Sequence, residues 1–244
     1  MQVKLQTLFM DIFYEPDKTF YDLLNEKKNF LFVGEAGSGK SEIVLNTAIW
    51  LANHKDKPVH VYDMDQSKPL FRSRDMADKF EKAGVHIHFQ EQYLDAPAVV
   101  GGVQASLMRD EYTILDIGGG ESAARVAGVF SHILREDSAA PIYIVNSYRP
   151  WTRTVENIDG TMSHILRSIR LKRIYILGNP NLGYRTTADE FIKGVHKIDE
   201  LIGEFTNVNS ACVRAGIYDE VREKTDKTLF PLEDLYLTYE WVDN

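Results

Sequence analysis

Six short apolar runs, separated by helix-compatible segments, constrain the fold of this chain more than any other feature. They are rich in Val, Ile, Tyr and Phe, and each ends in polar or turn residues. The runs span residues 29–34, 59–63, 85–89, 112–118, 142–146 and 173–179. Runs of this kind are typical of strands buried on both faces, and their alternation with helices is typical of a parallel sheet. A further run at 209–215 is a candidate seventh strand.

The segments between the runs predict helices. Residues 41–54 repeat apolar side chains at helical spacing, and the other predicted helices span 68–83, 96–110, 121–136, 151–170 and 187–204. We therefore expect an α/β fold with a mainly parallel central sheet flanked by helices, a Rossmann-like three-layer sandwich. The length of 244 residues suits one domain, 1–244, with 1–28 as an N-terminal extension and 226–244 as a C-terminal tail.

Charge and composition exclude several classes of function. A net charge of -8 and a pI near 5.4 argue against broad binding to nucleic acid or anionic lipid, which need clustered Lys and Arg. The single cysteine, Cys212, allows no intrachain disulfide and no metal cluster held by several thiolates of one chain. The N-terminal residues lack a secretory pattern, and no run approaches the roughly 18 apolar residues of a membrane span. We expect a cytoplasmic protein.

A glycine-rich turn follows the first run. It reads Gly34-Glu35-Ala36-Gly37-Ser38-Gly39-Lys40-Ser41 and matches G-x-x-x-x-G-K-[ST], the pattern of a phosphate-binding loop, or P-loop. The glycines let successive backbone N–H groups curl around an oxyanion, and the next helix directs its positive end to the same place. Lys40 is expected to reach the β and γ phosphates, and the Ser41 hydroxyl to ligate Mg²⁺.

Acidic residues at two other strand ends complete the expected site. Asp116 ends the run "YTILD" and is a candidate for holding Mg²⁺, while Gly119 or Gly120 is a candidate for sensing the γ-phosphate. Asp63 and Asp65 leave the run after the P-loop helix, so they should approach the same edge of the sheet. One of these two would stabilise hydrated Mg²⁺ and the other would orient or deprotonate a water or substrate hydroxyl.

The order of these motifs resembles the MinD/ParA branch of the SIMIBI class of P-loop NTPases. The matching pieces are "GEAGSGKS", "DMDQSKP", "LDIGGG", "IYIVNS" and "ILGNPN", over roughly residues 29–215. The resemblance implies ATP and Mg²⁺ as cofactors, switch roles for Asp63 and Asp65, a Walker B role for Asp116 and adenine contact by Asn179. It also implies a homodimer or another protein partner. Glu35 stands where the family usually carries an additional lysine that acts across the dimer, so that mechanism is not expected here.

"GSGKS" also resembles the P-loops of GTPases that deliver nickel to metalloenzymes. Those proteins read guanine with N-K-x-D, whereas "GNPNLG" offers Asn179 and Asn181 but no such Asp, which favours ATP over GTP. His86 and His88 share a face of one strand, and without a Cys or third His at ligand spacing we interpret them as histidines of a sheet margin.

The loop "NSYRPWTRT" carries Arg149, Trp151 and Arg153, which would cover a nucleotide or a partner, or would lie at the surface. Arg125 is a further candidate γ-phosphate sensor.

The sequence thus predicts a Mg²⁺-dependent ATP-binding protein and ATPase that acts as a nucleotide-dependent switch on a partner. The predicted catalytic residues are Lys40, Asp63 and Asp65, and the predicted metal ligands are Ser41, Asp63 and Asp116. Three alternatives remain open: a phosphotransferase or ligase resembling dethiobiotin synthetase, a metallochaperone-type GTPase, and a nucleotide-binding regulator without turnover.

Overall fold

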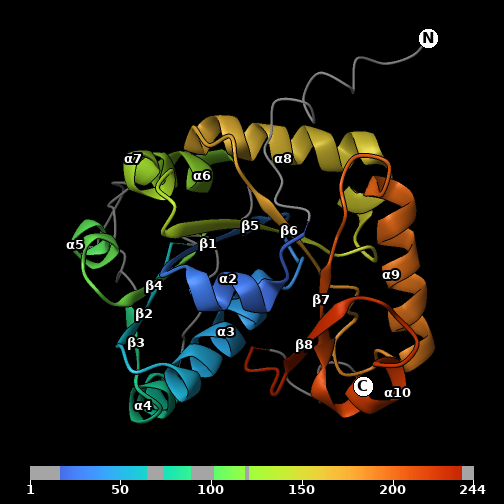
Figure 1. Cartoon of the computed structure of the whole chain (residues 1–244), viewed down its shortest axis with the longest axis horizontal. Coiled ribbons are helices and arrows are strands. Elements are labelled where there is room, and N and C mark those ends of the chain that lie inside the picture. Colours follow the sequence, from blue (N-terminus) through green and yellow to red (C-terminus); the bar gives the residue numbers. More distant parts are fainter. Residues whose placement is uncertain (1–16, 65–73, 89–101, 119–120, 238–244) are drawn as a thin grey trace.

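The apolar runs form one parallel sheet in the computed structural model, which describes residues 17–64, 74–88, 102–118 and 121–237 (Figure 1). Eight strands are found in these ranges, and each pairs in parallel with its neighbours in the order β3-β2-β4-β1-β5-β6-β7-β8. They are β1 (Asn29–Gly34), β2 (Val59–Asp63), β3 (Val85–His88), β4 (Tyr112–Asp116), β5 (Ala139–Val145), β6 (Tyr175–Gly178), β7 (Ser210–Arg214) and β8 (Thr228–Leu232).

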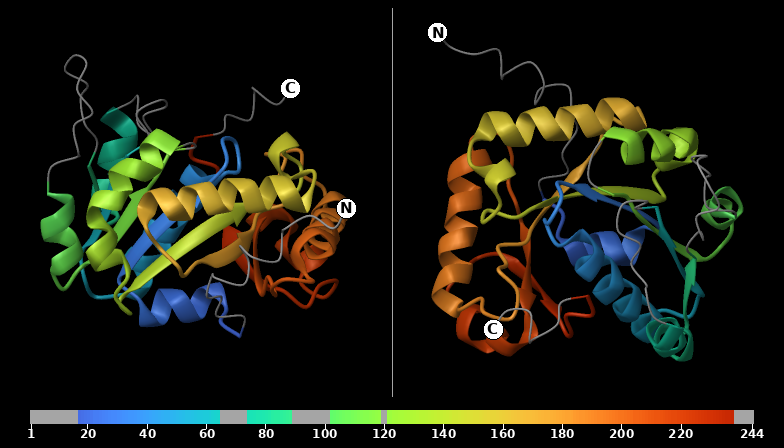
Figure 2. Two further views of the ribbon diagram at one scale, coloured as in Figure 1. Left: turned by 90° about the horizontal axis from the view of Figure 1, so that it is seen from above. Right: turned by 180° about the vertical axis from the view of Figure 1, so that it is seen from behind.

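Helices cover both faces of the sheet (Figure 2). Buried side chains of one face pack against α2 (Phe20–Glu26), α3 (Lys40–His54) and α4 (Arg74–Lys82). Those of the other face pack against α5 (Val103–Met108), α6 (Glu121–Ala127), α7 (Ser131–Leu134), α8 (Val155–Ile169) and α9 (Ala188–Ile202). The short α10 (Tyr218–Val221) adds to a smaller cluster with α9, β7 and β8. The predicted three-layer α/β fold is confirmed.

The predicted helix at 121–136 is interrupted in the structure. It is divided into α6, a 3₁₀ turn at Gly128–Phe130 and α7. The interruption coincides with a close approach to α8, because a Cβ atom at Gly128 would lie 2.6 Å from the carbonyl oxygen of Ser168. Only glycine allows the backbones to approach so closely.

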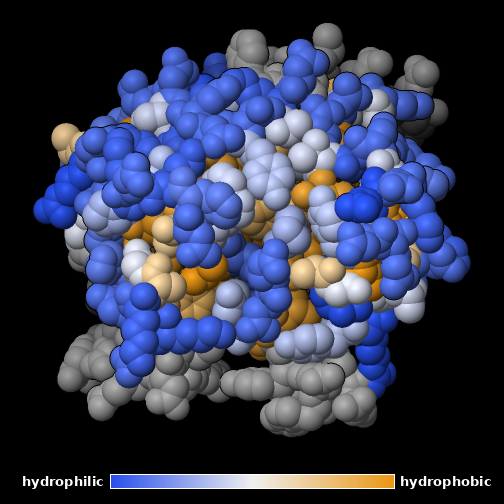
Figure 3. Space-filling model, turned by 60° about the horizontal axis from the view of Figure 1, so that its bottom comes forward, coloured by the Kyte–Doolittle hydropathy of each residue, from blue (hydrophilic) through white to orange (hydrophobic). Residues whose placement is uncertain are grey.

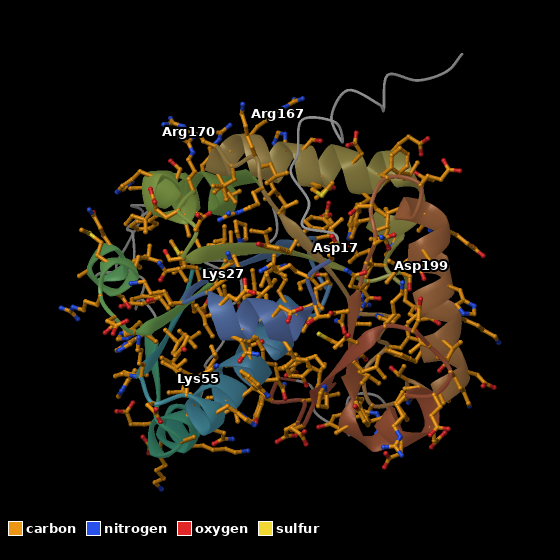
Figure 4. The ribbon with its side chains drawn as sticks, in the orientation of Figure 1. Asp17, Lys27, Lys55, Arg167, Arg170 and Asp199 are labelled. Atoms are coloured by element: carbon orange, nitrogen blue, oxygen red, sulfur yellow. The ribbon has the colours of Figure 1, made fainter. Side chains whose placement is uncertain are left out.

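Both ends of the chain contribute to the core. In α2, Phe20 packs edge-to-face on Phe230 of β8, with ring centroids 4.9 Å apart. β8, which lies in the predicted tail, extends the sheet beside β7. The loop before it is held by an ion pair of 2.9 Å from Lys227 to Asp199 of α9 (Figure 4). The described parts of the predicted extension and tail, 17–28 and 226–237, therefore supply structural parts of the domain.

The tail is also tied to the P-loop helix. The Asn46 side chain of α3 accepts from the backbone N–H of Glu233 at 2.8 Å and donates to the carbonyl of Asp234 at 2.9 Å. The Glu42 carboxylate accepts from the N–H of Leu237 at 2.7 Å. Polar side chains on α3 thus fix the chain that follows β8.

The surface is mainly polar. Figure 3 shows hydrophilic residues over most of one face, with apolar side chains in small patches between them. On another side, Arg167 and Arg170 lie exposed at the end of α8 (Figure 4). No helix in the described part of the chain combines the length and apolarity needed to cross a membrane.

A histidine cluster lies at the β2–β3 margin of the sheet. The register places His60 of β2 beside His86, and the His60 Nδ1 lies 2.8 Å from the His88 Nε2. The other His60 nitrogen lies 3.6 Å from a carboxylate oxygen of Glu111. The structure thus brings a third histidine to the predicted pair. Still, no group of three or more His, Cys, Asp or Glu residues among the described residues is arranged to hold a metal.

We predict that Phe20→Ala lowers the free energy of unfolding by about 3–5 kcal/mol, the usual cost of removing a buried phenylalanine. Phe20 is 3% exposed, whereas Val129, which is 59% exposed, provides the control. Val129→Ala should change the free energy by less than ~0.5 kcal/mol. Urea denaturation measures both values. Equal, small effects would show that α2 is not part of the cooperative core.

We also predict that stability falls as the pH drops below about 6.5, partly through this cluster. Burial is the main cause that lowers the pKa of His60 and of His88, and the charge of Glu111 opposes it. Both imidazoles are therefore held neutral in the fold, and protonation favours the unfolded chain. His88→Gln should flatten the dependence of the unfolding free energy on pH below about 6.5, compared with the unmodified protein. An unchanged profile in His88→Gln would contradict this assignment.

Candidate functional site

The P-loop connects the central strand β1 to α3. Its three glycines have positive φ angles: 149° at Gly34, 74° at Gly37 and 90° at Gly39. At Gly39, the residue before α3, a Cβ atom would also lie 2.3 Å from the amide nitrogen of Asn179. No other residue type combines this backbone angle with this approach. The loop thus has the strand, turn and helix context that the sequence pattern requires.

Lys40 is the first residue of α3, and its side chain turns back into the loop. It is 7% exposed, and its Nζ donates to the carbonyls of Gly34 at 3.1 Å and Glu35 at 3.0 Å. An ammonium group and the positive end of a 15-residue helix therefore lie at the same point. Together they favour an anion there.

Ser41 and Asp116 meet between α3 and β4. The Ser41 hydroxyl donates to the Asp116 carboxylate at 2.6 Å, and Asp116 is fully buried at 0% exposure. Asp63 of β2 is the register partner of Asp116 and is 6% exposed. Two neighbouring strands thus end in buried carboxylates beside a P-loop hydroxyl. Oxygen donors of this kind are the ligands that Mg²⁺ prefers, so these three residues fit the predicted ion.

The outer side of the P-loop is held by side chains from other strand ends. The Asn179 side-chain amide, just after β6, donates to the carbonyl of Ser38 at 2.7 Å. The Arg149 Nε, from the loop after β5, donates to the carbonyl of Gly37 at 2.7 Å. Two successive P-loop carbonyls are therefore bound from outside.

Glu35 of the P-loop is held by a residue of α8. Its carboxylate accepts a hydrogen bond from the Thr161 hydroxyl of α8. Tyr143 of β5 lies near enough that the Glu35 charge adds to burial, the main cause, in raising the pKa of Tyr143. The Glu35 side chain thus makes a contact within its own chain.

The segment after β6 contains Asn179 and Asn181, the two residues that the sequence offers for comparison with the N-K-x-D motif. Asn146 donates to the carbonyl of Asn181 at 2.9 Å, and the Asn181 side chain accepts from the N–H of Gly183 at 2.6 Å. Asn179 is 2% exposed, and its Oδ1 has no hydrogen-bond partner among the described residues. Leu182 occupies the position three residues after Asn179, where a guanine-reading Asp would stand.

The structure thus brings together most of the predicted site. Around the P-loop it gathers Gly34, Glu35, Ala36, Gly37, Ser38, Gly39, Lys40, Ser41, Asp63, Asp116 and Asn179. Predicted residues Asp65 and Gly119 lie outside the described residues.

Two other residues that the sequence singled out, Arg125 and Trp151, are exposed. Arg125 is exposed in the last turn of α6, and Trp151 is 52% exposed. Neither the place of Thr161 in the site nor the bond from Arg149 to Gly37 could be predicted, because no local pattern signals either.

Comparison with known proteins identifies the fold. No protein-family model and no curated protein matches the chain. The solved structure of the cell division protein FtsY from Thermotoga maritima is similar, with a TM-score of 0.53 and 13% identity, over 86% of this chain and 68% of that one. The signal recognition particle receptor FtsY from Elizabethkingia anophelis, in complex with GDP, gives a TM-score of 0.50 and 14% identity, over 86% and 63%.

The similarity concerns the fold. The chain spans 68% and 63% of these two FtsY structures. At identities of 13% and 14% the similarity extends to the arrangement of strands and helices and carries no substrate or partner with it. The protein shares the fold of these FtsY structures, a parallel sheet flanked by helices, and the predicted fold class agrees with it.

We predict that Ser41→Ala weakens the Mg²⁺ dependence of nucleotide binding. Loss of the hydroxyl beside Asp116 should reduce the apparent Mg²⁺ affinity by about 10–100-fold. Mg²⁺ titration with a fluorescent nucleoside triphosphate measures the change. Ser168→Ala on α8 serves as the control and should titrate like the unmodified protein. If Ser41→Ala keeps the original Mg²⁺ dependence, the hydroxyl is not part of a metal site.

Proposed function

We propose that the protein binds a nucleoside triphosphate with Mg²⁺, prefers ATP and hydrolyses it as part of a nucleotide-dependent switch on a partner. The observation that carries this proposal is the hydrogen bond from Ser41 to the buried Asp116 beside a buried P-loop lysine. A glycine-rich turn between a strand and a helix does not by itself indicate nucleotide binding, because such a turn also serves a purely structural role. A lysine and a hydroxyl-carboxylate pair at the same turn match what triphosphate and Mg²⁺ require.

Each residue has a defined part in the proposed reaction. Lys40 offsets charge on the γ-phosphate, and Ser41, Asp63 and Asp116 are the residues that would hold Mg²⁺. When bound, the ion neutralises charge on the β and γ phosphates. Asp63 or Asp65 orients a water molecule and takes its proton, as the water oxygen bonds to the γ-phosphorus and the bond from that phosphorus to the β–γ bridging oxygen breaks.

The preference for ATP follows from the groups near Asn179. The Asn179 Oδ1 is an acceptor without a partner among the described residues, and the exocyclic amine of adenine is a donor that suits it. Guanine presents an oxygen at that position and needs a carboxylate for its N1 and N2 hydrogens. Leu182 stands where N-K-x-D proteins carry that carboxylate. These groups therefore favour an ATPase over a metallochaperone-type GTPase.

The switch role rests on the proposed site and on the resemblance to the MinD/ParA branch. Asp63 ends β2 two residues before Asp65, and Asp116 ends β4 two residues before Gly118. A ligand that binds at these carboxylates would thereby favour one conformation of the segments that follow both strands. The partner is proposed to be a protein, either another molecule or a second copy of the chain.

We predict that ATP binds at least about 10-fold more tightly than GTP, and that Lys40→Ala reduces the affinity for both by about 100-fold. Lys55→Ala is the matched control, because Lys55 follows the last residue of the same helix and donates to Asn25 (Figure 4). Competition against a fluorescent ATP analogue measures the affinities of all three proteins for both nucleotides. Tighter binding of GTP would show that GTP, and not ATP, is the preferred nucleotide. Unchanged affinity in Lys40→Ala would show that the P-loop does not bind the nucleotide.

Turnover separates the remaining alternatives. A partner-regulated switch has slow basal hydrolysis that rises with a protein partner, whereas a phosphotransferase or ligase depends on a metabolite. Tight ATP binding without turnover, both in the unmodified protein and in Asp65→Asn, would identify a non-catalytic regulator.

A further inference from the structure

The contact between Arg149 and the P-loop joins two parts of the site that are 112 residues apart in the sequence. The Arg149 Nε donates to the Gly37 carbonyl at 2.7 Å. Three atoms of the side chain, Nε, Cδ and Cζ, lie 3.6–3.8 Å from the position that a Cβ of Gly37 would occupy. The guanidinium therefore rests against the tip of the loop and is half-buried there.

The loop that carries Arg149 is itself tightly bonded. The Arg149 N–H donates to the Asn146 carbonyl at 3.1 Å, and the Arg149 carbonyl accepts from the Thr152 N–H at 3.1 Å. The buried Thr152 hydroxyl lies within hydrogen-bond distance of both carbonyls, at 2.5 Å from Asn146 and 2.9 Å from Arg149. Pro150 follows directly and fixes its own φ angle. The backbone of Arg149 is therefore held in place independently of the P-loop.

The direction of the bond matters for the P-loop. A phosphate is bound by N–H groups that point into the loop, and this requires that the carbonyls of the same residues point elsewhere. Arg149 binds the carbonyl of Gly37 and Asn179 binds that of Ser38, the next residue. A stretch with three glycines has many alternative backbone conformations, and each of these two hydrogen bonds, called a tether below, removes some of them.

We propose that Arg149 is a positioning residue that holds the P-loop in its nucleotide-binding conformation before the nucleotide arrives. This inference rests on the proposed function and deepens it, because it identifies what preorganises the phosphate site. The bond spans from the loop after β5 to the loop after β1, so the two neighbouring strands act as the rigid support.

Hydrogen exchange of the nucleotide-free protein tests the tether directly. Arg149→Met keeps a long side chain but removes the donors, and Arg149→Lys keeps a donor and the charge. Arg153→Met changes an exposed arginine of the same connection and is the matched control. We expect the amides of residues 34–41 to exchange about 10-fold faster in Arg149→Met, and near the original rate in Arg149→Lys and Arg153→Met. An unchanged rate in Arg149→Met, or an equal rise in Arg153→Met, would overturn the proposal.

Nucleotide affinity provides the second measurement. In Arg149→Met the Kd values of ATP and ADP should rise by the same factor, about 10-fold, because the loop binds the β-phosphate of both. The kcat at saturating ATP should change less than about 2-fold, since the tether acts on binding. A loss confined to ATP would overturn the positioning role, because it would indicate direct contact with the γ-phosphate. If the unmodified protein binds no nucleotide, the proposed function fails, and the exchange experiment still decides whether the tether exists.

Discussion

The position of β1 between β4 and β5 is the constraint on which the site depends. The register pairs Phe32 of β1 with Asp116 of β4, and Gly34 with Ile144 of β5. Because all strands run in parallel, their carboxyl ends meet at one edge of the sheet. The P-loop therefore leaves the middle of the sheet beside a buried carboxylate, and the short hydrogen bond from Ser41 follows from this placement.

The P-loop is stabilised from inside and outside. Inside, Lys40 donates to the first two carbonyls of the loop and compensates for their desolvation. Outside, Arg149 and Asn179 bind the carbonyls of Gly37 and Ser38, and Thr161 binds the Glu35 carboxylate. A glycine-rich segment loses much backbone entropy on ordering, so contacts made before a ligand binds reduce the cost of binding.

Glu35 of the P-loop is bonded within its own chain. In the MinD/ParA branch an additional lysine near this position acts across a dimer. Here a carboxylate takes that position and bonds to Thr161 of α8 in the same chain. The fold is shared with FtsY, and Glu35 is the point at which the P-loop sequence departs from the pattern of the MinD/ParA branch, as the sequence alone indicates.

The sequence alone determined the features that short patterns encode. The P-loop, the first seven strands, most helices, and the carboxylates Asp63 and Asp116 could be predicted, because turn chemistry and apolar periodicity are local properties. Asn179 could be assigned to the site only through the family resemblance.

Tertiary structure decided the rest, because it depends on contacts between distant residues. The break at Gly128 coincides with the close approach of α8, and the eighth strand pairs in parallel with β7. Arg149 and Thr161 reach the P-loop from 112 and 126 residues away, so no local pattern could reveal them. Periodicity and turn chemistry specify each element, and only their packing decides which side chains meet.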